Sequence, residues 1–517
     1  MSNPRESGAA QVEAAAATET AIPIARRLDA RARALLVLAA ATLLLTGVAG
    51  WLIILWRGIA ARVGRFDFSH YYAAARALRL DPHANIYSMA VLSASATASY
   101  VVAPTDVPYL YPPLPALLLI PLTAFSFPVA ADIFFAVNVL AWLLCMLLVA
   151  REVRLLLGAS LAARQEQDTS SSGLLARLLA DPAPLVALAI CAPLFFLSRP
   201  GVSTLGNGQI NFLVLLPLVC VPWLTRRGNE RGTGIAIAIA TMLKLTPGVL
   251  LLYLLVRRRW QALAAALITL AALSALSLLV VGPHVFFAYP ATVLQTGGAN
   301  SSLPNNEALF APVLLAVTTA NPALASAARM CEYILLGALA VELGVILWQS
   351  RPAGAIHLTA ETLRREALAY AMALCAIVLL SPAAWAHHYV WLLPAAAFVV
   401  ALAIRAVATR PAWAGGSRVL LALLVGAVVA GVLLNLPLPN GWDTDPGTHA
   451  LLLFGLPLRP WLQELRPLGG LLAIVVAATL LLRTRTAITA TTRMASWIRP
   501  KPHVKTKIPA PLPASRQ

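Results

Sequence analysis

Residues 34–56 read ALLVLAAATLLLTGVAGWLIILW, an unbroken run without a charged side chain. About 20 apolar residues in a helix, each adding about 1.5 Å, cross the roughly 30 Å of hydrocarbon in a bilayer. This run therefore predicts a transmembrane helix. Because the preceding residues 1–25 lack an apolar core, we interpret them as a disordered cytoplasmic tail and the run as an uncleaved signal anchor.

Comparable apolar runs recur along the rest of the chain. The sequence is 60% hydrophobic and only 12% charged, whereas soluble domains carry about 25% charged residues. This composition predicts an all-α polytopic membrane protein with about 11–13 transmembrane helices. The candidate spans after the anchor are 111–126, 130–150, 183–198, 209–225, 233–255, 261–281, 308–320, 330–349, 367–384, 388–406, 418–436 and 467–483.

The organisation predicted from these runs is a single membrane domain over residues 26–484, followed by a basic cytoplasmic tail over 485–517. With both tails in the cytoplasm the number of spans must be even, but the candidates with the anchor give an odd number. The runs 111–126, 233–255 and 308–320 are short or interrupted by proline. One of them is expected to be re-entrant rather than spanning.

The formal charge of +18 comes from basic residues clustered beside apolar runs. Such clusters are typical of cytoplasmic loops that face anionic lipid headgroups, and they argue against a nucleic-acid partner. The clusters are Arg226–Arg227, Arg257–Arg259, Arg364–Arg365 and the Lys/Arg-rich tail after Leu482.

The cysteines show no CxxC or metal-ligand spacing and all lie within apolar segments. We therefore expect them to pack between helices. They are Cys145, Cys191, Cys220, Cys331 and Cys375.

The first long polar interruption, from Gly58 to Pro108, contains Asp67 just beyond the anchor. A carboxylate there can act as the base that removes an acceptor proton during inverting glycosyl transfer. The alternative is a helix cap or a solvated charge. The Ala-rich piece around Ala73–Leu80 predicts an amphipathic helix lying on the membrane face.

A histidine pair, His387 and His388, lies between two apolar runs beside Trp385 and Trp391. A neutral imidazole can act as a base or hydrogen-bond a donor phosphate, and a sugar ring can stack on an indole. The alternative is a pair of interfacial histidines in an aromatic belt.

Lys244 lies inside an apolar run, too far from the arginines at 257–259 to be explained by snorkelling there. Intramembrane charges are costly and usually face a cavity or a partner. Binding of a donor phosphate, an internal ion pair and a snorkelled stem all remain open for Lys244. Arg62, Arg65 and Arg199 are rival phosphate ligands, with headgroup contact as their alternative.

Two uncharged motifs add candidate site residues. Gly208-Gln209-Ile210-Asn211 places two amides at a helix start, where they can cap the helix or bind sugar hydroxyls. Tyr111-Pro112-Pro113 predicts a rigid extended turn at another helix start, shaping a cavity wall.

Read in order, a series of motifs resembles the signatures of glycosyltransferase family 87 over about residues 60–400. The series is Asp-Phe-x-x-Tyr-Tyr-x-Ala-Ala at 67–75, Asn-Ile-Tyr at 85–87, Tyr-Pro-Pro-Leu at 111–114, Gly-Gln-Ile-Asn at 208–211, Lys-Leu-Thr-Pro at 244–247, Arg-Arg-Trp at 258–260, Asn-Ser-Ser-Leu at 300–303 and Ser-Pro-x-x-Trp-x-His-His-Tyr-Val-Trp at 381–391.

That resemblance implies a polyprenyl-phosphate-mannose-dependent α-mannosyltransferase of the GT-C architecture. It implies catalytic roles for Asp67 and for His388 or His387, on the extracytoplasmic face of the plasma membrane. Pro304 and Glu307 depart from the expected pattern, which puts acceptor recognition in doubt. The substrate-binding residues it suggests are Tyr71, Tyr111, Asn207, Gln209, Asn211, Lys244, Asn300, Trp385 and Arg65.

The leading hypothesis is therefore a hexosyltransferase that moves mannose from a polyprenyl-phosphate donor to a lipid or glycan acceptor, within membrane lipids. A transporter or lipid-linked-sugar flippase is the alternative, and a non-catalytic scaffold is a third reading. No cofactor is expected, because no phosphate-binding loop or metal-ligand cluster is visible, although a divalent metal requirement stays open. Asp443 and Asp445 are interpreted as a turn.

Overall fold

The computed structural model describes residues 30–60, 66–97, 108–158, 181–300, 306–351, 360–409, 417–435, 452–453, 456–457 and 467–480. Its elements are α3 (Ala30–Ala60), α4 (Phe66–Leu80), α5 (Met89–Thr97), α6 (Pro113–Leu119), η1 (Ile120–Ala124), α7 (Phe127–Leu156), α9 (Ala183–Phe196), α10 (Arg199–Asn207), α11 (Asn211–Arg226), α12 (Glu230–Leu243), η3 (Thr246–Gly248), α13 (Val249–Val256), α14 (Trp260–Asn300), α15 (Ala311–Ala320), η4 (Pro322–Leu324), α16 (Ala325–Gln349), α17 (Ala360–Leu379), η5 (Ala386–Leu392), α18 (Leu393–Thr409), α19 (Ser417–Asn435), β1 (Leu452–Leu453) and β2 (Leu456–Pro457). A last helix covers Pro467–Leu480.

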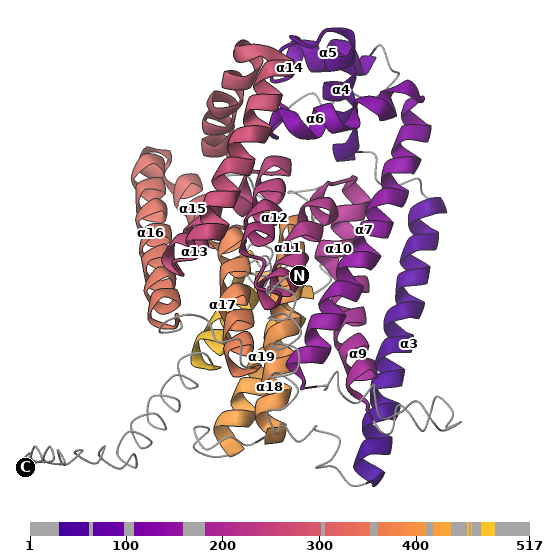
Figure 1. Ribbon diagram of the computed structural model, residues 1–517. Helices are drawn as coiled ribbons and strands as arrows, with labels where there is room; N and C mark the ends of the chain where they lie inside the picture. Colours follow the sequence, from indigo (N-terminus) through magenta and orange to yellow (C-terminus); the bar gives the residue numbers. More distant parts are fainter. Residues whose placement is uncertain are drawn as a thin grey trace, which may run out of the picture.

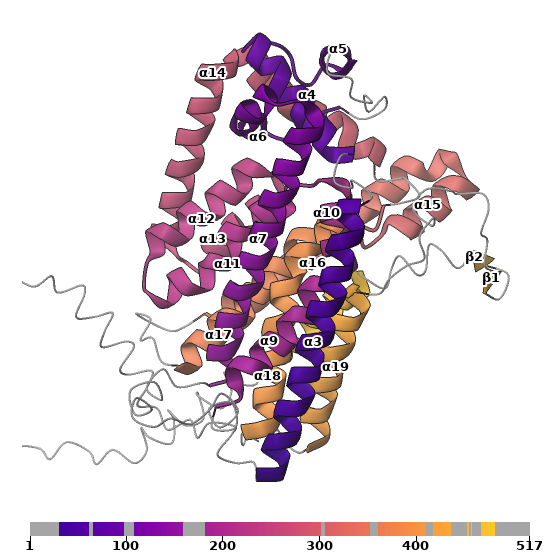
Figure 2. The same ribbon diagram turned by 90° about the vertical axis from the view of Figure 1, so that its right-hand side faces the viewer.

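The long helices run side by side, with α4, α5 and α6 gathered at one end of the bundle, which we call the cap end (Figure 1). The helix α14 extends to the cap end, where it packs against α6 (Figure 2). The predicted all-α polytopic fold is confirmed. The strands in the described part of the chain form one short antiparallel pair, β1 with β2.

Fewer helices than expected are long enough to span a membrane individually. Among the described residues, 5 helices have the length and apolar composition of a span, or 6 when α9 and α10, bent by 49°, count as one. Shorter apolar helices, such as Asn211–Arg226 and Thr246–Val256, correspond to other candidate spans. The number of about 11–13 transmembrane helices stays a prediction, because several of the apolar runs form broken or short helices. The run 233–255 is interrupted at Lys244, and 111–126 divides into α6 and η1.

The helix predicted in the first loop exists as α4, and it is buried within the protein. In α4, consecutive residues from Phe68 to Ala75 are buried on every side of the helix. Phe68 stacks on Phe134 of α7 at 4.7 Å between ring centroids, and the Tyr72 hydroxyl donates to the Phe125 carbonyl at 2.8 Å. Protein covers both the polar and the apolar sides of α4, and its position on the membrane face stays a prediction.

Buried ion pairs define the opposite end of the bundle. Arg226 at the end of α11 binds Glu152 of α7 through two hydrogen bonds. In the turn between α13 and α14, Arg257 binds Glu366 of α17, and Arg259 binds Glu230 of α12 at 2.6 Å. We call this the basic end, defined by Arg226, Arg257 and Arg259. These contacts join α7, α11, α12, α13 and α17 where the helices reach that end.

The cysteines agree only in part with the packing expected of them. Cys145, Cys191 and Cys375 are buried, and Cys220 is partly buried. Cys331 on α16 is exposed, so the expectation is wrong for this residue, because it lies on a side of α16 that no described element covers.

The helices α12 and α14 pack closely against each other at Gly234. A Cβ atom added at Gly234 would lie 2.0 Å from the Ala262 carbonyl oxygen and 2.8 Å from the Ala266 nitrogen. Both atoms belong to backbone, so they cannot move aside as a flexible side chain would. Glycine at position 234 therefore sets the distance between α12, which leads to Lys244, and α14.

We predict that Gly234→Ala destabilises the protein by about 1–3 kcal/mol, the usual cost of overpacking a tight contact. Thermal unfolding of the full chain in detergent should show a melting temperature several degrees lower. Gly337→Ala on α16 is the matched control, because no atom lies within 4 Å of its added Cβ. Equal melting temperatures for the two variants would contradict the contact.

Candidate active site

Four segments far apart in the sequence meet where the cap end joins the bundle. They are the first turn of α4, the start of α11, the break between α12 and η3, and η5. Each brings polar side chains into a surrounding of tyrosine and tryptophan rings. The site has two halves, one built around a carboxylate and one around an ammonium group.

The carboxylate half is organised by Gln209. Its Nε2 donates to Asp67 Oδ2 at 2.7 Å. Its Oε1 accepts hydrogen bonds from the Tyr71 hydroxyl at 3.1 Å and from the Tyr111 hydroxyl at 2.9 Å. This network fixes the orientation of the amide, because a phenol donates to the carbonyl oxygen and the carboxylate accepts from the NH₂ group. Asp67 stays partly exposed, while Gln209 is only 4% exposed.

Burial raises the pKa of Asp67 to about 6, against the hydrogen bond from Gln209 and the charge of Lys244, which both lower it. A carboxylate with a pKa near the working pH is both ionised and basic enough to accept a proton in a transition state. The role in proton transfer predicted for Asp67 is compatible with this environment and stays a prediction.

The ammonium half is organised by Lys244. The helix α12 ends at Leu243, and Lys244 has an extended backbone with φ −155° and ψ 129°. Its Nζ donates to Asn211 Oδ1 at 3.0 Å and lies 3.0 Å from His388 Nε2. When Lys244 is protonated its amine has only donors, so Nε2 then accepts and the His388 proton lies on Nδ1. The snorkelling alternative for Lys244 is wrong, since this side chain is only 8% exposed.

Aromatic rings enclose the ammonium group. The Lys244 Nζ lies 5.4 Å from the ring centroids of both Tyr111 and Trp391. The His388 ring stacks on Trp391 at 5.5 Å with an interplanar angle of 8°. Rings at this distance stabilise a cation through their π faces, an effect that desolvation strengthens.

The loop that carries the histidines is held by Asn306, whose role sequence reasoning missed. Asn306 Nδ2 donates to the Pro382 carbonyl at 3.1 Å, and Oδ1 accepts from the Ala384 nitrogen at 2.8 Å. The Glu307 nitrogen donates to the Ala384 carbonyl at 2.7 Å. A signal was present, because Glu307 marks a departure from the family pattern, and its nitrogen pairs with the segment before Trp385.

Most of the predicted site residues come together, although their roles stay predictions. The amides of Gln209 and Asn211 do not cap α11, whose first turn has no side-chain cap. Asn211 Nδ2 instead donates to the His387 carbonyl at 2.8 Å. The predicted residues that gather here are Asp67, Tyr71, Tyr111, Gln209, Asn211, Lys244, Trp385, His387 and His388.

The structure places one predicted residue outside this cluster and does not describe the side chains of Asn300 and Arg65. Asn207 donates to Ser203 within its own helix at 3.5 Å. Asn300 is the last residue of α14. Arg65 lies outside the described residues. Within the described ranges, no three His, Cys, Asp or Glu side chains gather as metal ligands would.

Fold and site together define a multi-pass membrane protein with a titratable carboxylate beside a buried cation. The model of glycosyltransferase family 87 matches residues 109–382, and the chain belongs to that family. No solved structure matches the chain, so the GT-C architecture stays a prediction.

Similar curated proteins come from mycobacteria. A polyprenol-phosphate-mannose-dependent alpha-(1-2)-phosphatidylinositol mannoside mannosyltransferase of Mycobacterium tuberculosis is 29% identical over 56% of this chain and 61% of its own length. Its Mycolicibacterium smegmatis counterpart is 28% identical over 58% and 63%. A pentamannoside mannosyltransferase of M. tuberculosis is 26% identical over 37% and 40%. The chain thus matches less than two thirds of the length of these relatives.

We predict that the Asp67 carboxyl titrates with a midpoint near pH 6. Gln209→Leu should raise this midpoint, because it removes a hydrogen bond that lowers the pKa of Asp67. Difference infrared spectroscopy of the carboxyl stretch, assigned with Asp67→Asn, measures both values. Asn207→Leu is the matched control, an amide two residues away that does not contact Asp67. A wild-type midpoint near 4 would contradict the burial of this group.

Proposed function

We propose that this chain transfers a hexose, with mannose as the expected sugar, from a polyprenyl-phosphate donor to a lipid or glycan acceptor. The observation that carries the proposal is the pairing of Asp67, with its pKa raised to about 6, and Lys244 in one enclosed cluster. Glycosyl transfer needs both functions at once, a base for the acceptor and a positive charge for the leaving phosphate.

In this reaction the acceptor hydroxyl attacks the anomeric carbon of the sugar. Asp67 takes the hydroxyl proton while the bond from that carbon to the phosphate oxygen breaks. The lipid phosphate leaves with the bonding electron pair. In an inverting transfer the attack and the departure occur on opposite faces of the sugar, so base and cation must stand apart. The Asp67 carboxylate and the Lys244 ammonium group belong to different halves of the site, which supports such a separation.

Lys244 is suited to the phosphate because its hydrogen-bonding capacity is not exhausted. An ammonium group has three donors. Asn211 and His388 each accept one, which leaves a third for a phosphate oxygen. The contacts to Asn211 and His388 also hold the amine in place before the donor binds, so little side-chain entropy is lost on binding.

The distribution of charge supports an extracytoplasmic site in the plasma membrane. The helix α11 begins at Asn211 in the site and ends at Arg226 in the basic end. Arg257 and Arg259 lie at that same end, beyond α13. Because loops rich in arginine favour the cytoplasm, Asp67 and the cap end are assigned to the other side.

The names of the relatives support the donor and the kind of acceptor. Those proteins depend on polyprenol-phosphate-mannose and act on phosphatidylinositol mannosides. For this chain we keep the acceptor at the level of a lipid or glycan hydroxyl, because the matched region covers only part of each relative.

We predict that the purified full chain in liposomes converts radiolabelled polyprenyl-phosphate mannose and an acceptor from a lipid and glycan panel into labelled product. Nucleotide-activated mannose alone, in membranes cleared of polyprenyl phosphate, should give none, since the sequence has no nucleotide-binding loop. Transfer of label across the bilayer without product would instead identify a flippase and refute the proposal.

We predict that Asp67→Asn lowers kcat by about 10² to 10⁴, the usual contribution of a general base. Asparagine keeps the size and a hydrogen-bonding oxygen for Gln209, so the fold and donor binding should survive. Turnover above about a third of wild type with intact donor binding would place the base elsewhere, because it falls far short of that range.

Lys244→Gln provides the comparison within the same site. Loss of a charge-assisted hydrogen bond costs about 1.5–3 kcal/mol, which corresponds to about 10- to 100-fold weaker donor binding. If Asp67→Asn lowers kcat and Lys244→Gln weakens donor binding, the two residues have different roles. Asn207→Ala, outside the cluster, should change neither constant.

A further inference from the structure

The turn between α13 and α14 contains three consecutive arginines that behave differently. Arg257 and Arg259 are each 6% exposed and are held by Glu366 and Glu230. The middle residue, Arg258, is exposed and has no ion pair among the described residues. Its neighbours therefore fasten the turn to the bundle, while Arg258 points outward.

The backbone at Arg258 is left-handed, with φ 56°, the single such case among the described residues other than glycine. The helix ends at Gly158, Gly208 and Gly228 use glycine in this conformation, as expected for a residue with no Cβ. The turns at Gly228 and Arg258 share one pattern of backbone hydrogen bonds. In the first, the nitrogens of Gly228 and Asn229 donate to the carbonyls of Thr225 and Leu224. In the second, the nitrogens of Arg258 and Arg259 donate to the carbonyls of Leu255 and Leu254.

Arginine at this position is therefore not explained by the turn itself. A non-glycine residue held in the left-handed region is strained, and such strain is characteristic of functional sites. Glycine would form the same turn more easily. The arginine side chain must then serve a purpose outside the turn, and the surface around it indicates which.

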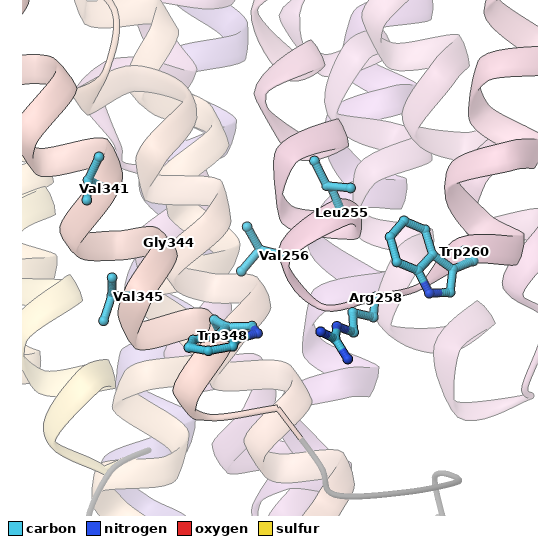
Figure 3. Close-up of a pocket in the computed structure, with 8 residues that line it drawn as sticks. All are labelled: Leu255, Val256, Arg258, Trp260, Val341, Gly344, Val345 and Trp348. Atoms are coloured by element: carbon cyan, nitrogen blue, oxygen red, sulfur yellow. The ribbon is translucent and has the colours of Figure 1, made fainter.

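Arg258 lies at the mouth of an open groove of about 500 Å³ between α13 and α16 (Figure 3). The guanidinium group lies between the indoles of Trp260 and Trp348, with aliphatic side chains above it (Figure 3). Leu255 and Val341 are among these and are 43% and 68% exposed. Indoles beside an apolar surface are typical of the level where hydrocarbon meets headgroups.

A second guanidinium group stands at the same place. Arg351 lies over the ring of Trp348, 4.7 Å from its centroid. Its Nη1 is buried without a hydrogen-bond partner among the described residues. Desolvation, followed by repulsion from Arg258 and Arg257, lowers the pKa of Arg351. Like charges held together in this way are stabilised by an anion between them.

We propose that this groove binds an anionic phospholipid, with its phosphodiester between Arg258 and Arg351 and an acyl chain along the wall formed by α13 and α16. Charge complementarity selects an anion, the tryptophans set the headgroup level, and the exposed aliphatic wall requires a hydrocarbon ligand. The groove belongs to the basic end, beyond α13 from Lys244, so the lipid is not the donor in the candidate active site.

The test is native mass spectrometry of the full chain, delipidated in detergent and titrated with phosphatidylglycerol or with phosphatidylcholine of the same acyl chains. One molecule of phosphatidylglycerol should bind per chain, at least tenfold more tightly than phosphatidylcholine does. Glycerol 3-phosphate, which carries the phosphate without the hydrocarbon, should not displace it at equal concentration. Equal binding of the two lipids, or displacement by glycerol 3-phosphate, would overturn the proposal.

Arg258→Gly is the decisive variant, because glycine suits the left-handed turn and leaves the fold intact. It should bind phosphatidylglycerol at least tenfold more weakly while its melting temperature without lipid is unchanged or higher. Arg258→Asn, which also tolerates this backbone, should lose affinity equally. Arg231→Gln, an exposed arginine at the start of α12, is the matched control and should bind as wild type. Wild-type binding by both Arg258 variants would overturn the assignment.

Discussion

A buried ammonium group is stable in a membrane protein only when polar partners replace the water it has lost. Lys244 obtains them from Asn211 at the start of α11 and from His388 in η5. If α12 continued through position 244, the Lys244 side chain would project from the side of the helix instead of from its end. It could then contact neither Asn211 nor His388. The requirement to satisfy one charge thus explains the break in an apolar run and the meeting of three distant segments.

The charged groups at the two ends of the bundle have different kinds of partners. At the basic end, Arg226, Arg257 and Arg259 have carboxylate partners, and these ion pairs join neighbouring helices. At the cap end the polar groups contact amides, phenols and an imidazole instead, and they keep capacity for a ligand. Ion pairs between helices hold the bundle together, whereas the neutral partners at the cap end leave the hydrogen-bonding capacity that the proposed reaction requires.

The sequence predicted the membrane class well, because composition and long apolar runs depend only on local chemistry. It predicted Asp67, Lys244 and His388 as site residues because charged or imidazole groups beside apolar runs need a reason to be there. It could not choose between Asn207 and Gln209, which are two residues apart. Only Gln209 reaches Asp67, across 142 positions, and that choice depends on where the turn at Gly208 directs the chain.

The role of Gln209 follows from what a direct contact between the two charged halves would do. The Lys244 charge already lowers the pKa of Asp67, although burial outweighs it. A salt bridge at hydrogen-bond distance would lower this pKa further, because a close opposite charge stabilises the carboxylate. It would also consume the donor that Lys244 has left. Gln209 satisfies Asp67 with a neutral amide, and the phenols of Tyr71 and Tyr111 hold that amide in place. The carboxylate therefore remains basic and the ammonium group remains available.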